Sequence, residues 1–196
     1  MKQNKIIAIT GGIGSGKSSV LEILKSLNKT VISCDEITKE LYGKRLVKSK
    51  IKELFPSAVS GKIFLKVDKS VISKAVFNDR ENYEKLTRYL TPLIFSVAMT
   101  RAKKLANNGD VFVETPVLFE LKYDKHFEKI IVVKRKLEDR IGAVISRSNL
   151  TKEQVIERIN NQINYDETDF SNCVVIDNDG DLEKLKISTL KAIEKI

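Results

Sequence analysis

Residues 5–24 read KIIAITGGIGSGKSSVLEIL, and this stretch decides the fold. An apolar run ends at Thr10, residues 11–18 fit the pattern G-x-x-x-x-G-K-[ST], and a helical pattern follows from Lys17. Glycines let the backbone turn so that consecutive N–H groups wrap phosphate oxygens, and the positive end of the following helix adds to that field. A glycine turn that merely joins a strand to a helix is the alternative, but the complete pattern in this context favours a phosphate-binding loop.

The loop indicates a nucleoside triphosphate, and we expect ATP. Lys17 would reach the β- and γ-phosphates, and the Ser18 hydroxyl would bind Mg²⁺. The residues of this segment expected to contact ATP are Gly12, Ile13, Gly14, Ser15, Gly16, Lys17, Ser18 and Ser19. No guanine-reading N-K-x-D occurs in the sequence, and the D-x-x-G at residues 177–180 lies too far along the chain for a switch region. These features favour a small-molecule kinase over a GTPase.

The composition limits the possible functions. The chain has 196 residues, 42% hydrophobic and 31% charged, which is an ordinary globular mix. Its net charge of +9 attracts polyanions, but no block of five like charges points to nucleic acid. Cys34 and Cys173 form no CxxC pair, and no apolar run approaches the roughly 20 residues of a membrane helix. We expect a cytoplasmic protein without a membrane or nucleic-acid partner, and a monomer rather than an oligomer.

Five short runs rich in Ile and Val predict buried strands. They are apolar throughout rather than alternating, as strands covered on both faces require, and helical patterns separate them. The predicted fold is therefore α/β, with three α/β/α layers around a five-stranded parallel sheet. The expected strands are Lys5–Thr10, Thr30–Ser33, Val111–Glu114, Ile130–Val133 and Cys173–Ile176.

Two helical excursions interrupt this sheet within a single domain. The predicted core comprises about residues 1–35, 110–135 and 170–196. A helical substrate-binding insert is expected at about 36–109, and a second helical region at about 136–166.

Local signals predict where several helices begin and end. Asn78 followed by Glu81, and Thr151 followed by Gln154, have the spacing of capping boxes. Pro92 predicts a break or kink near Thr91, because the residue before a proline resists the α region. Gly109 is expected to close the last helix of the insert in the left-handed conformation. A final helix is expected from about Asp181, after the turn at residues 178–180.

Two carboxylates follow predicted strands, at the edge where α/β sheets place their ligands. Asp35 closes the second strand, where it would orient an acceptor hydroxyl and take its proton; an N-cap for the following helix is the alternative. Glu114 ends the third strand, where an acid binds Mg²⁺ directly or through water, although an acid at a strand end also occurs by chance.

Arginines gather in the second predicted helical region. Arg140 and Arg147 are seven residues apart, about two helical turns, so both can project from one face. Arg158 follows on the next predicted helix. Guanidinium groups bind phosphate in a bidentate manner, so these residues suit the stabilisation of a transferring phosphoryl group, while a solvated surface role is the alternative for each one.

Taken together and in order, these motifs resemble the dephospho-CoA kinase family, and the marks span nearly the whole chain. The first three are TGGIGSGKS at 10–18, the acid of SCDEI at Asp35, and Val67-Asp68-Lys69 with Val76-Phe77. The later ones are PVLFE at 116–120, then Arg140, Arg147, Arg158, Ile159 and Gln162, then Ile176, Asp177, Asn178 and Gly180. The family usually has a histidine before the proline where this chain has Thr91, an aspartate where it has Glu114, and an arginine where it has Lys69.

The resemblance implies a reaction and roles for residues. ATP with Mg²⁺ would phosphorylate the ribose 3′-hydroxyl of dephospho-CoA, with Asp35, Lys17 and Arg140 as the catalytic groups. Arg140, Arg147 and Asn178 would contact ATP in addition to the loop, and the helical region at about 136–166 would close over the site as a lid. The implied substrate contacts are Asp35, Thr91, Pro92, Leu118, Phe119, Glu120 and Arg158. A nucleoside or nucleotide kinase with the same core, an ATP-responsive RNA-binding module and an inactive member of the family are the alternatives.

Overall fold

The computed structural model describes residues 4–61, 64–148 and 150–196, except for the side chains of Phe77 and Asn78. These residues form two compact units. One comprises the chain up to Ile32 together with Arg101–Ile196, and the other comprises Ser33–Thr100. Each unit is described separately.

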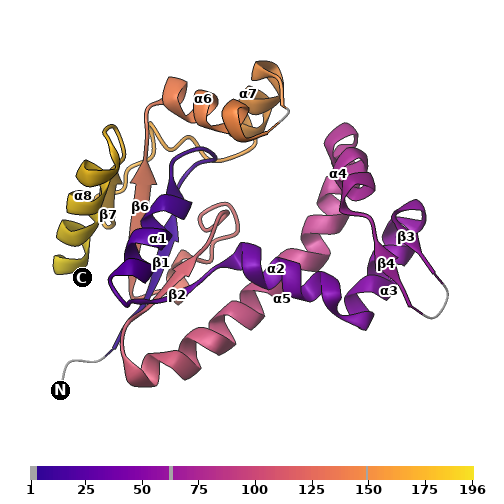
Figure 1. The fold of residues 1–196 in the computed structure, drawn as a ribbon, viewed down its shortest axis with the longest axis horizontal. Coiled ribbons are helices and arrows are strands. Elements are labelled where there is room, and N and C mark those ends of the chain that lie inside the picture. Colours follow the sequence, from indigo (N-terminus) through magenta and orange to yellow (C-terminus); the bar gives the residue numbers. More distant parts are fainter. Residues whose placement is uncertain (1–3, 62–63, 149) are drawn as a thin grey trace. The chain divides into compact units, whose positions relative to one another are not determined.

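The first unit is built on a five-stranded parallel sheet, as the sequence predicts (Figure 1). Strand β1 is central; β5 and then β2 lie on one side of it, and β6 and then β7 on the other. The observed strands begin or end within about one residue of those predicted: β1 (Ile6–Thr10), β2 (Thr30–Ile32), β5 (Val111–Glu114), β6 (Lys129–Lys134) and β7 (Val174–Asp177). Because the strands are parallel, their carboxyl ends share one edge of the sheet.

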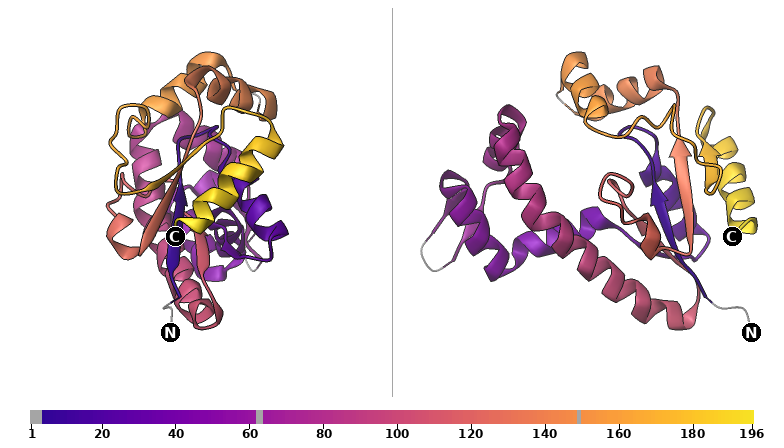
Figure 2. Two further views of the ribbon diagram at one scale, coloured as in Figure 1. Left: turned by 90° about the vertical axis from the view of Figure 1, so that its left-hand side faces the viewer. Right: turned by 180° about the vertical axis from the view of Figure 1, so that it is seen from behind.

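Helices cover the sheet and extend from that edge. Helix α1 (Lys17–Ser26) and helix α8 (Leu182–Glu194) pack beside each other on one face. Helices α6 (Leu137–Arg147) and α7 (Lys152–Asn160) follow β6 at its carboxyl end, as Figure 2 shows from two sides. Short 3₁₀ turns at Ala106–Asn108 and Asp124–His126 lead into β5 and β6.

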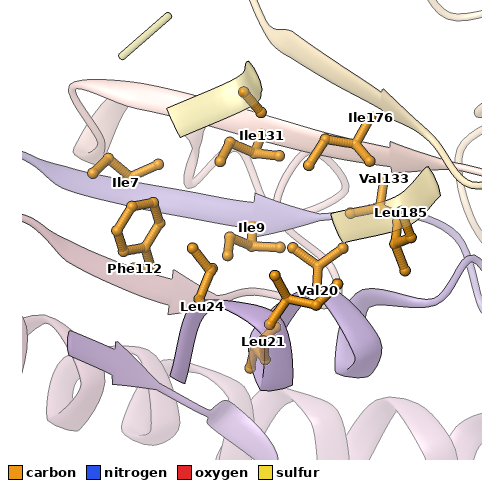
Figure 3. Close-up of a cluster of buried hydrophobic side chains, with 12 residues drawn as sticks. Ile7, Ile9, Val20, Leu21, Leu24, Phe112, Ile131, Val133, Ile176 and Leu185 are labelled. Carbon is orange, nitrogen blue, oxygen red and sulfur yellow. The ribbon is translucent and has the colours of Figure 1, made fainter. Parts of the chain in front are cut away.

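Side chains on the two faces of the sheet belong to different clusters. Ile7, Ile9 and Ile131 point toward α1 and α8 and form the main core with Val20, Leu24, Phe112 and Leu185 (Figure 3). The next residue of β6, Val132, packs on Tyr165 and Phe170 instead. This alternation follows from the two-residue period of a strand, and it explains why the runs are apolar throughout.

The second unit is mainly helical. It contains α2 (Cys34–Gly43), α3 (Arg45–Leu54), α4 (Lys69–Asn78) and most of α5 (Arg80–Leu105), which continues into the first unit. A 3₁₀ turn at Pro56–Ala58 leads to two-residue strands, β3 (Val59–Ser60) and β4 (Lys66–Val67), which pair antiparallel. Strands this short leave no periodic pattern in the sequence, and we did not predict them.

Several predicted helix boundaries are wrong in the second unit. Helix α5 runs through Pro92, so the break expected near Thr91 does not occur, whereas the kink that was the alternative there stays a prediction. Asp79, rather than Asn78, precedes α5, and its Oδ1 accepts hydrogen bonds from the N–H groups of Glu81 at 2.8 Å and Asn82 at 3.4 Å. Asn78 is the last residue of α4.

Of the other boundary predictions, the one for Gly109 is wrong, and those for the starts of α7 and α8 are confirmed. Gly109 has φ 154° and ψ 177°, so it has a positive φ but not the left-handed helical conformation. The capping box of Thr151 and Gln154 is confirmed, with both reciprocal hydrogen bonds present at the start of α7. Asp181 caps α8 by accepting a hydrogen bond from the N–H of Lys184 at 2.9 Å.

Among the described residues, no helix combines the length and the hydropathy that a membrane span requires. The roles expected for residues 36–109 as a substrate insert and 136–166 as a lid stay predictions, because they concern function rather than the placement of helices.

Truncation of Ile131 tests the main core. Ile131 is fully buried, so Ile131→Ala should lower the free energy of unfolding by about 2–5 kcal/mol, since it removes buried methyl groups and leaves a cavity. The matched control is Ile187→Ala on α8, whose side chain is 50% exposed, with an expected change within about 0.5 kcal/mol. Urea denaturation measures both; equal losses would contradict the assignment of Ile131 to the core.

Candidate active site

The phosphate loop connects β1 directly to α1. Gly16 has φ 95° and stands at the N-cap of α1, a conformation that side chains other than glycine rarely adopt. Its carbonyl accepts hydrogen bonds from the N–H groups of Ser19 at 3.0 Å and Val20 at 3.2 Å. The first turn of α1, in which every residue is described, carries neither a capping side chain nor an acid. Its N–H groups and helix dipole therefore favour an anion at this end.

Asn178, the residue that follows β7 at the edge of the sheet, holds this loop. Its Nδ2 donates a hydrogen bond to the carbonyl of Ser15 at 2.9 Å, and the side chain is buried. A Cβ on Gly16 would stand 2.2 Å from the same Nδ2, so a side chain there would displace the Asn178 amide in addition to straining the backbone. Asn178 thus supports the loop from behind, and its predicted contact with ATP stays a prediction.

Lys17 lies folded over the loop. Its Nζ donates hydrogen bonds to the carbonyls of Gly11 at 2.6 Å and Gly12 at 3.0 Å. These bonds keep the ammonium group close to the loop. A bound phosphate would replace carbonyl oxygens with more strongly attractive anionic ones.

Arg140 is the one lid arginine that the structure buries against the loop. Its side chain is 3% exposed, its Nε donates to the carbonyl of Ile13 at 3.1 Å, and its guanidinium lies 3.7 Å from a carboxylate oxygen of Asp166. Burial lowers the pKa of Arg140, and the charge of Asp166 acts in the opposite direction. The guanidinium still stays charged near neutral pH, because the unperturbed pKa of arginine is so high.

The other lid arginines lie in different surroundings. Arg147 is exposed at the last position of α6, and Arg158 is half-buried on α7. The spacing of Arg140 and Arg147 therefore did not indicate a shared environment.

Oxygen ligands suitable for Mg²⁺ lie on adjacent elements. Glu114 is buried at the end of β5, paired in register with Ile9 of β1, and Ser18 is exposed in the first turn of α1. Carboxylate and hydroxyl oxygens are donors that Mg²⁺ accepts alongside substrate phosphates. Among the described residues there is no group of three or more His, Cys, Asp or Glu that would form an all-protein metal site.

Residues 116–120 (PVLFE) follow β5, and Phe119 packs against the cluster of Val132, Tyr165 and Phe170. Leu118 is fully buried, and the ring centroid of Phe119 lies 5.4 Å from that of Phe170. Glu120 Oε1 accepts a hydrogen bond from the N–H of Ile163 at 3.3 Å, while Oε2 is buried and has no hydrogen-bond partner among the described residues. The contacts of these residues with substrate stay predictions.

The remaining predicted residues belong to the second unit. Asp35 is exposed in the first turn of α2, but Ser33 is the N-cap, with its side chain accepting from the N–H of Glu36 at 3.5 Å. The alternative that Asp35 is the cap is therefore wrong. Thr91 is half-buried and Pro92 is exposed, both in α5.

Tyr165 and Asp166, which we did not predict, complete the lid side of the loop. The Tyr165 hydroxyl lies 3.2 Å from Oγ1 of Thr10, the last residue of β1, and both side chains are buried. Burial is the main cause that raises the pKa of Tyr165 to about 12. The sequence carries no local signal for this pair, because the partners are 155 positions apart.

Comparison with known proteins decides the family. The family model described as dephospho-CoA kinase matches residues 5–184. This chain belongs to the dephospho-CoA kinase family. It is therefore a kinase that transfers phosphate to an alcohol group.

Dephospho-CoA kinases from several bacteria resemble this chain over most of its length. One from Thermus thermophilus is 32% identical over 188 residues, covering 96% of this chain and 89% of its own. One from Fusobacterium nucleatum is 31% identical over 180 residues and covers 92% of each chain. The crystal structure of TT1252 from Thermus thermophilus has a TM-score of 0.81 at 32% identity, covering 99% of this chain and 98% of that one.

More distant kinases share the fold alone. Dephospho-CoA kinase from Campylobacter jejuni has a TM-score of 0.66 at 24% identity and covers 99% of this chain and 98% of its own. A gluconokinase from Sinorhizobium meliloti has a TM-score of 0.53 at 14% identity. The match to the dephospho-CoA kinase family includes the positions at which Thr91, Glu114 and Lys69 replace the usual residues.

The buried Tyr165 should make stability fall at high pH. Only the unfolded chain, with an ordinary tyrosine pKa near 10, releases this proton between about pH 10 and pH 12, so the folded state loses about 1.4 kcal/mol by pH 11. Tyr165→Phe should remove this part of the slope. Urea denaturation of both proteins from pH 8 to 11 measures the difference, and parallel curves would show that the phenol titrates normally in the folded state.

Proposed function

We propose that this protein transfers the γ-phosphoryl group of ATP to the ribose 3′-hydroxyl of dephospho-CoA, giving coenzyme A and ADP. The observation that carries the proposal is the phosphate loop at the head of a family match that runs over residues 5–184. The names of the relatives in Thermus thermophilus and Fusobacterium nucleatum support dephospho-CoA as the acceptor.

The cationic groups of the first unit stabilise the transferring phosphoryl group. Lys17 exchanges the carbonyls of Gly11 and Gly12 for the β- and γ-phosphates, close to its present position. Arg140 adds a second positive charge next to the loop, and its burial strengthens the interaction because water screens it less. The first turn of α1 provides backbone N–H groups for the same phosphates.

Asp35 acts on the acceptor hydroxyl. It follows β2 in the first turn of α2, and its exposed carboxylate is not needed for capping, since Ser33 has that role. The carboxylate orients the 3′-hydroxyl and takes its proton, while the new bond from that oxygen to phosphorus forms and the bond from phosphorus to ADP breaks. Thr91 and Pro92 of α5 are contacts to dephospho-CoA in the second unit. Residues 118–120 and Arg158 are contacts to it in the first unit.

Mg²⁺ accompanies ATP in this proposal. The Ser18 hydroxyl and the Glu114 carboxylate, directly or through water, would hold the ion. When bound, Mg²⁺ neutralises charge on the phosphates. Residues 136–166 act as a lid that excludes water, which is the competing acceptor. The protein acts as a monomer in the cytoplasm.

A panel of acceptors tests the substrate. Purified protein with ATP and Mg²⁺ is offered dephospho-CoA, AMP, UMP, a deoxynucleoside or no acceptor, and the product mass is determined. Dephospho-CoA alone should gain one phosphate. Transfer to a nucleoside or nucleotide instead would keep the roles of the loop and replace the substrate, whereas no transfer to any acceptor would contradict the proposal.

Removal of the Asp35 carboxylate separates chemistry from nucleotide binding. Asp35→Asn should lower kcat by about 100-fold or more, because general-base assistance is lost, while KM for ATP changes little. The neighbouring exposed carboxylate gives the matched control, Glu36→Gln, which should retain activity. An equal loss of kcat in Asp35→Asn and Glu36→Gln would show that Asp35 acts through helix stability instead.

Removal of the Lys17 ammonium group tests the loop. Lys17→Ala should abolish transfer, while circular dichroism shows the fold intact.

A further inference from the structure

Ile13, at the tip of the phosphate loop, is bound by the lid through three different groups. Its N–H donates a hydrogen bond to Oε1 of Gln162 at 2.7 Å. Its carbonyl accepts one from Nε of Arg140 at 3.1 Å. Its side chain packs against the cluster of Ile141, Val144 and Val155, which joins α6 to α7. All of these residues belong to the first unit, so the contacts lie within one compact body.

The hydrogen bond that the Gln162 side chain accepts fixes one particular peptide. The N–H of Ile13 and the carbonyl of Gly12 belong to the same planar unit, so holding one end orients the other. That Gly12 carbonyl accepts hydrogen bonds from Lys17 Nζ at 3.0 Å and from the N–H of Ser15 at 3.2 Å. The following peptide places the Ile13 carbonyl on Arg140. The Gln162 acceptor therefore orients one of the carbonyls that hold Lys17, and it does so next to the peptide whose carbonyl accepts from Arg140.

Gln162 is suited to this task by its placement and its chemistry. It lies just beyond α7, and its own N–H donates to the carbonyl of Ile159 at 3.0 Å, so its backbone is anchored to the last turn of that helix. The side chain is half-buried. The neutral amide of Gln162 accepts a hydrogen bond from the N–H of Ile13 without placing a negative charge beside a site for phosphates.

We propose that Gln162 is a positioning residue for phosphoryl transfer, which sets the Gly12–Ile13 peptide and through it the placement of Lys17 and Arg140. The proposal rests on the proposed function, because it assigns Lys17 and Arg140 to stabilisation of the transferring group. It also makes the loop tip part of the lid: any movement of α6 and α7 displaces the peptide that positions the cations.

Gln162→Met and Gln162→Glu separate the acceptor from the bulk of the side chain. Methionine has a similar length without the acceptor oxygen, and glutamate keeps that oxygen. With dephospho-CoA and saturating ATP, Gln162→Met should lower kcat about tenfold, the size of one lost hydrogen bond to a half-buried group, with a smaller change in KM for ATP. Gln162→Glu should recover most of kcat, with a higher KM for ATP because its charge opposes the phosphates. Asn161→Ala, an exposed neighbour, should behave as wild type.

Hydrogen exchange of the Ile13 amide provides a readout that does not depend on catalysis. In the nucleotide-free protein, Gln162→Met should increase the exchange rate of this amide about tenfold or more, while Gln162→Glu keeps its protection. If wild type fails to phosphorylate dephospho-CoA, the proposed function is overturned, while the exchange result still reports on the Gln162 contact.

Two results would overturn the positioning role. One is an unchanged kcat in Gln162→Met although the Ile13 amide has lost protection. The other is an equal loss of kcat in Gln162→Met and Gln162→Glu together with an equal fall in Tm, which indicates a structural role. If Gln162→Met does not fold, Gln162→Asn, which is one methylene shorter, replaces it with the same expectations.

Discussion

The phosphate loop depends on hydrogen bonds from parts of the chain that are distant in sequence. A glycine-rich segment gains freedom to turn its N–H groups inward, but the same freedom leaves its folded conformation weakly determined. Asn178 holds the carbonyl of Ser15, and Gln162 and Arg140 hold the two polar groups of Ile13. Asn178, just after the edge strand β7, and residues of the lid thus fix the conformation of the glycine-rich loop. The same contacts position Lys17 and Arg140.

The strands and the loop could be predicted from sequence because their signals are local. The strands of the sheet are short runs rich in apolar residues. Strands β1 and β5 are buried along their whole length, and Ile7 and Ile131 occupy the core that this pattern implies. The loop has a fixed composition that follows from phosphate chemistry. The capping box of Thr151 and Gln154 spans a few residues, and it too is present as predicted.

What could not be predicted depends on tertiary contacts or on choices between equivalent local signals. Ser33 and Asp35 are both good N-caps, and only the structure shows that Ser33 has that role. Pro92 was expected to interrupt a helix, but α5 accommodates it. Tyr165 meets Thr10 across 155 positions, and Gln162 meets Ile13 across 149. No pattern within a window of sequence specifies such pairs.

The internal partners of the cations bear on how a phosphate binds. Lys17 and Arg140 donate to loop carbonyls, and Arg140 also lies near Asp166. Their charges are therefore partly compensated by groups of the protein itself, so the loop does not hold concentrated positive charge that would repel itself. Binding of ATP exchanges carbonyl partners for phosphate oxygens over a short distance. The free-energy gain is the difference between two sets of hydrogen bonds rather than the full strength of a new ion pair. This exchange favours the ligand that offers charged oxygens to both cations at once, which a polyphosphate does and a single neutral hydroxyl does not.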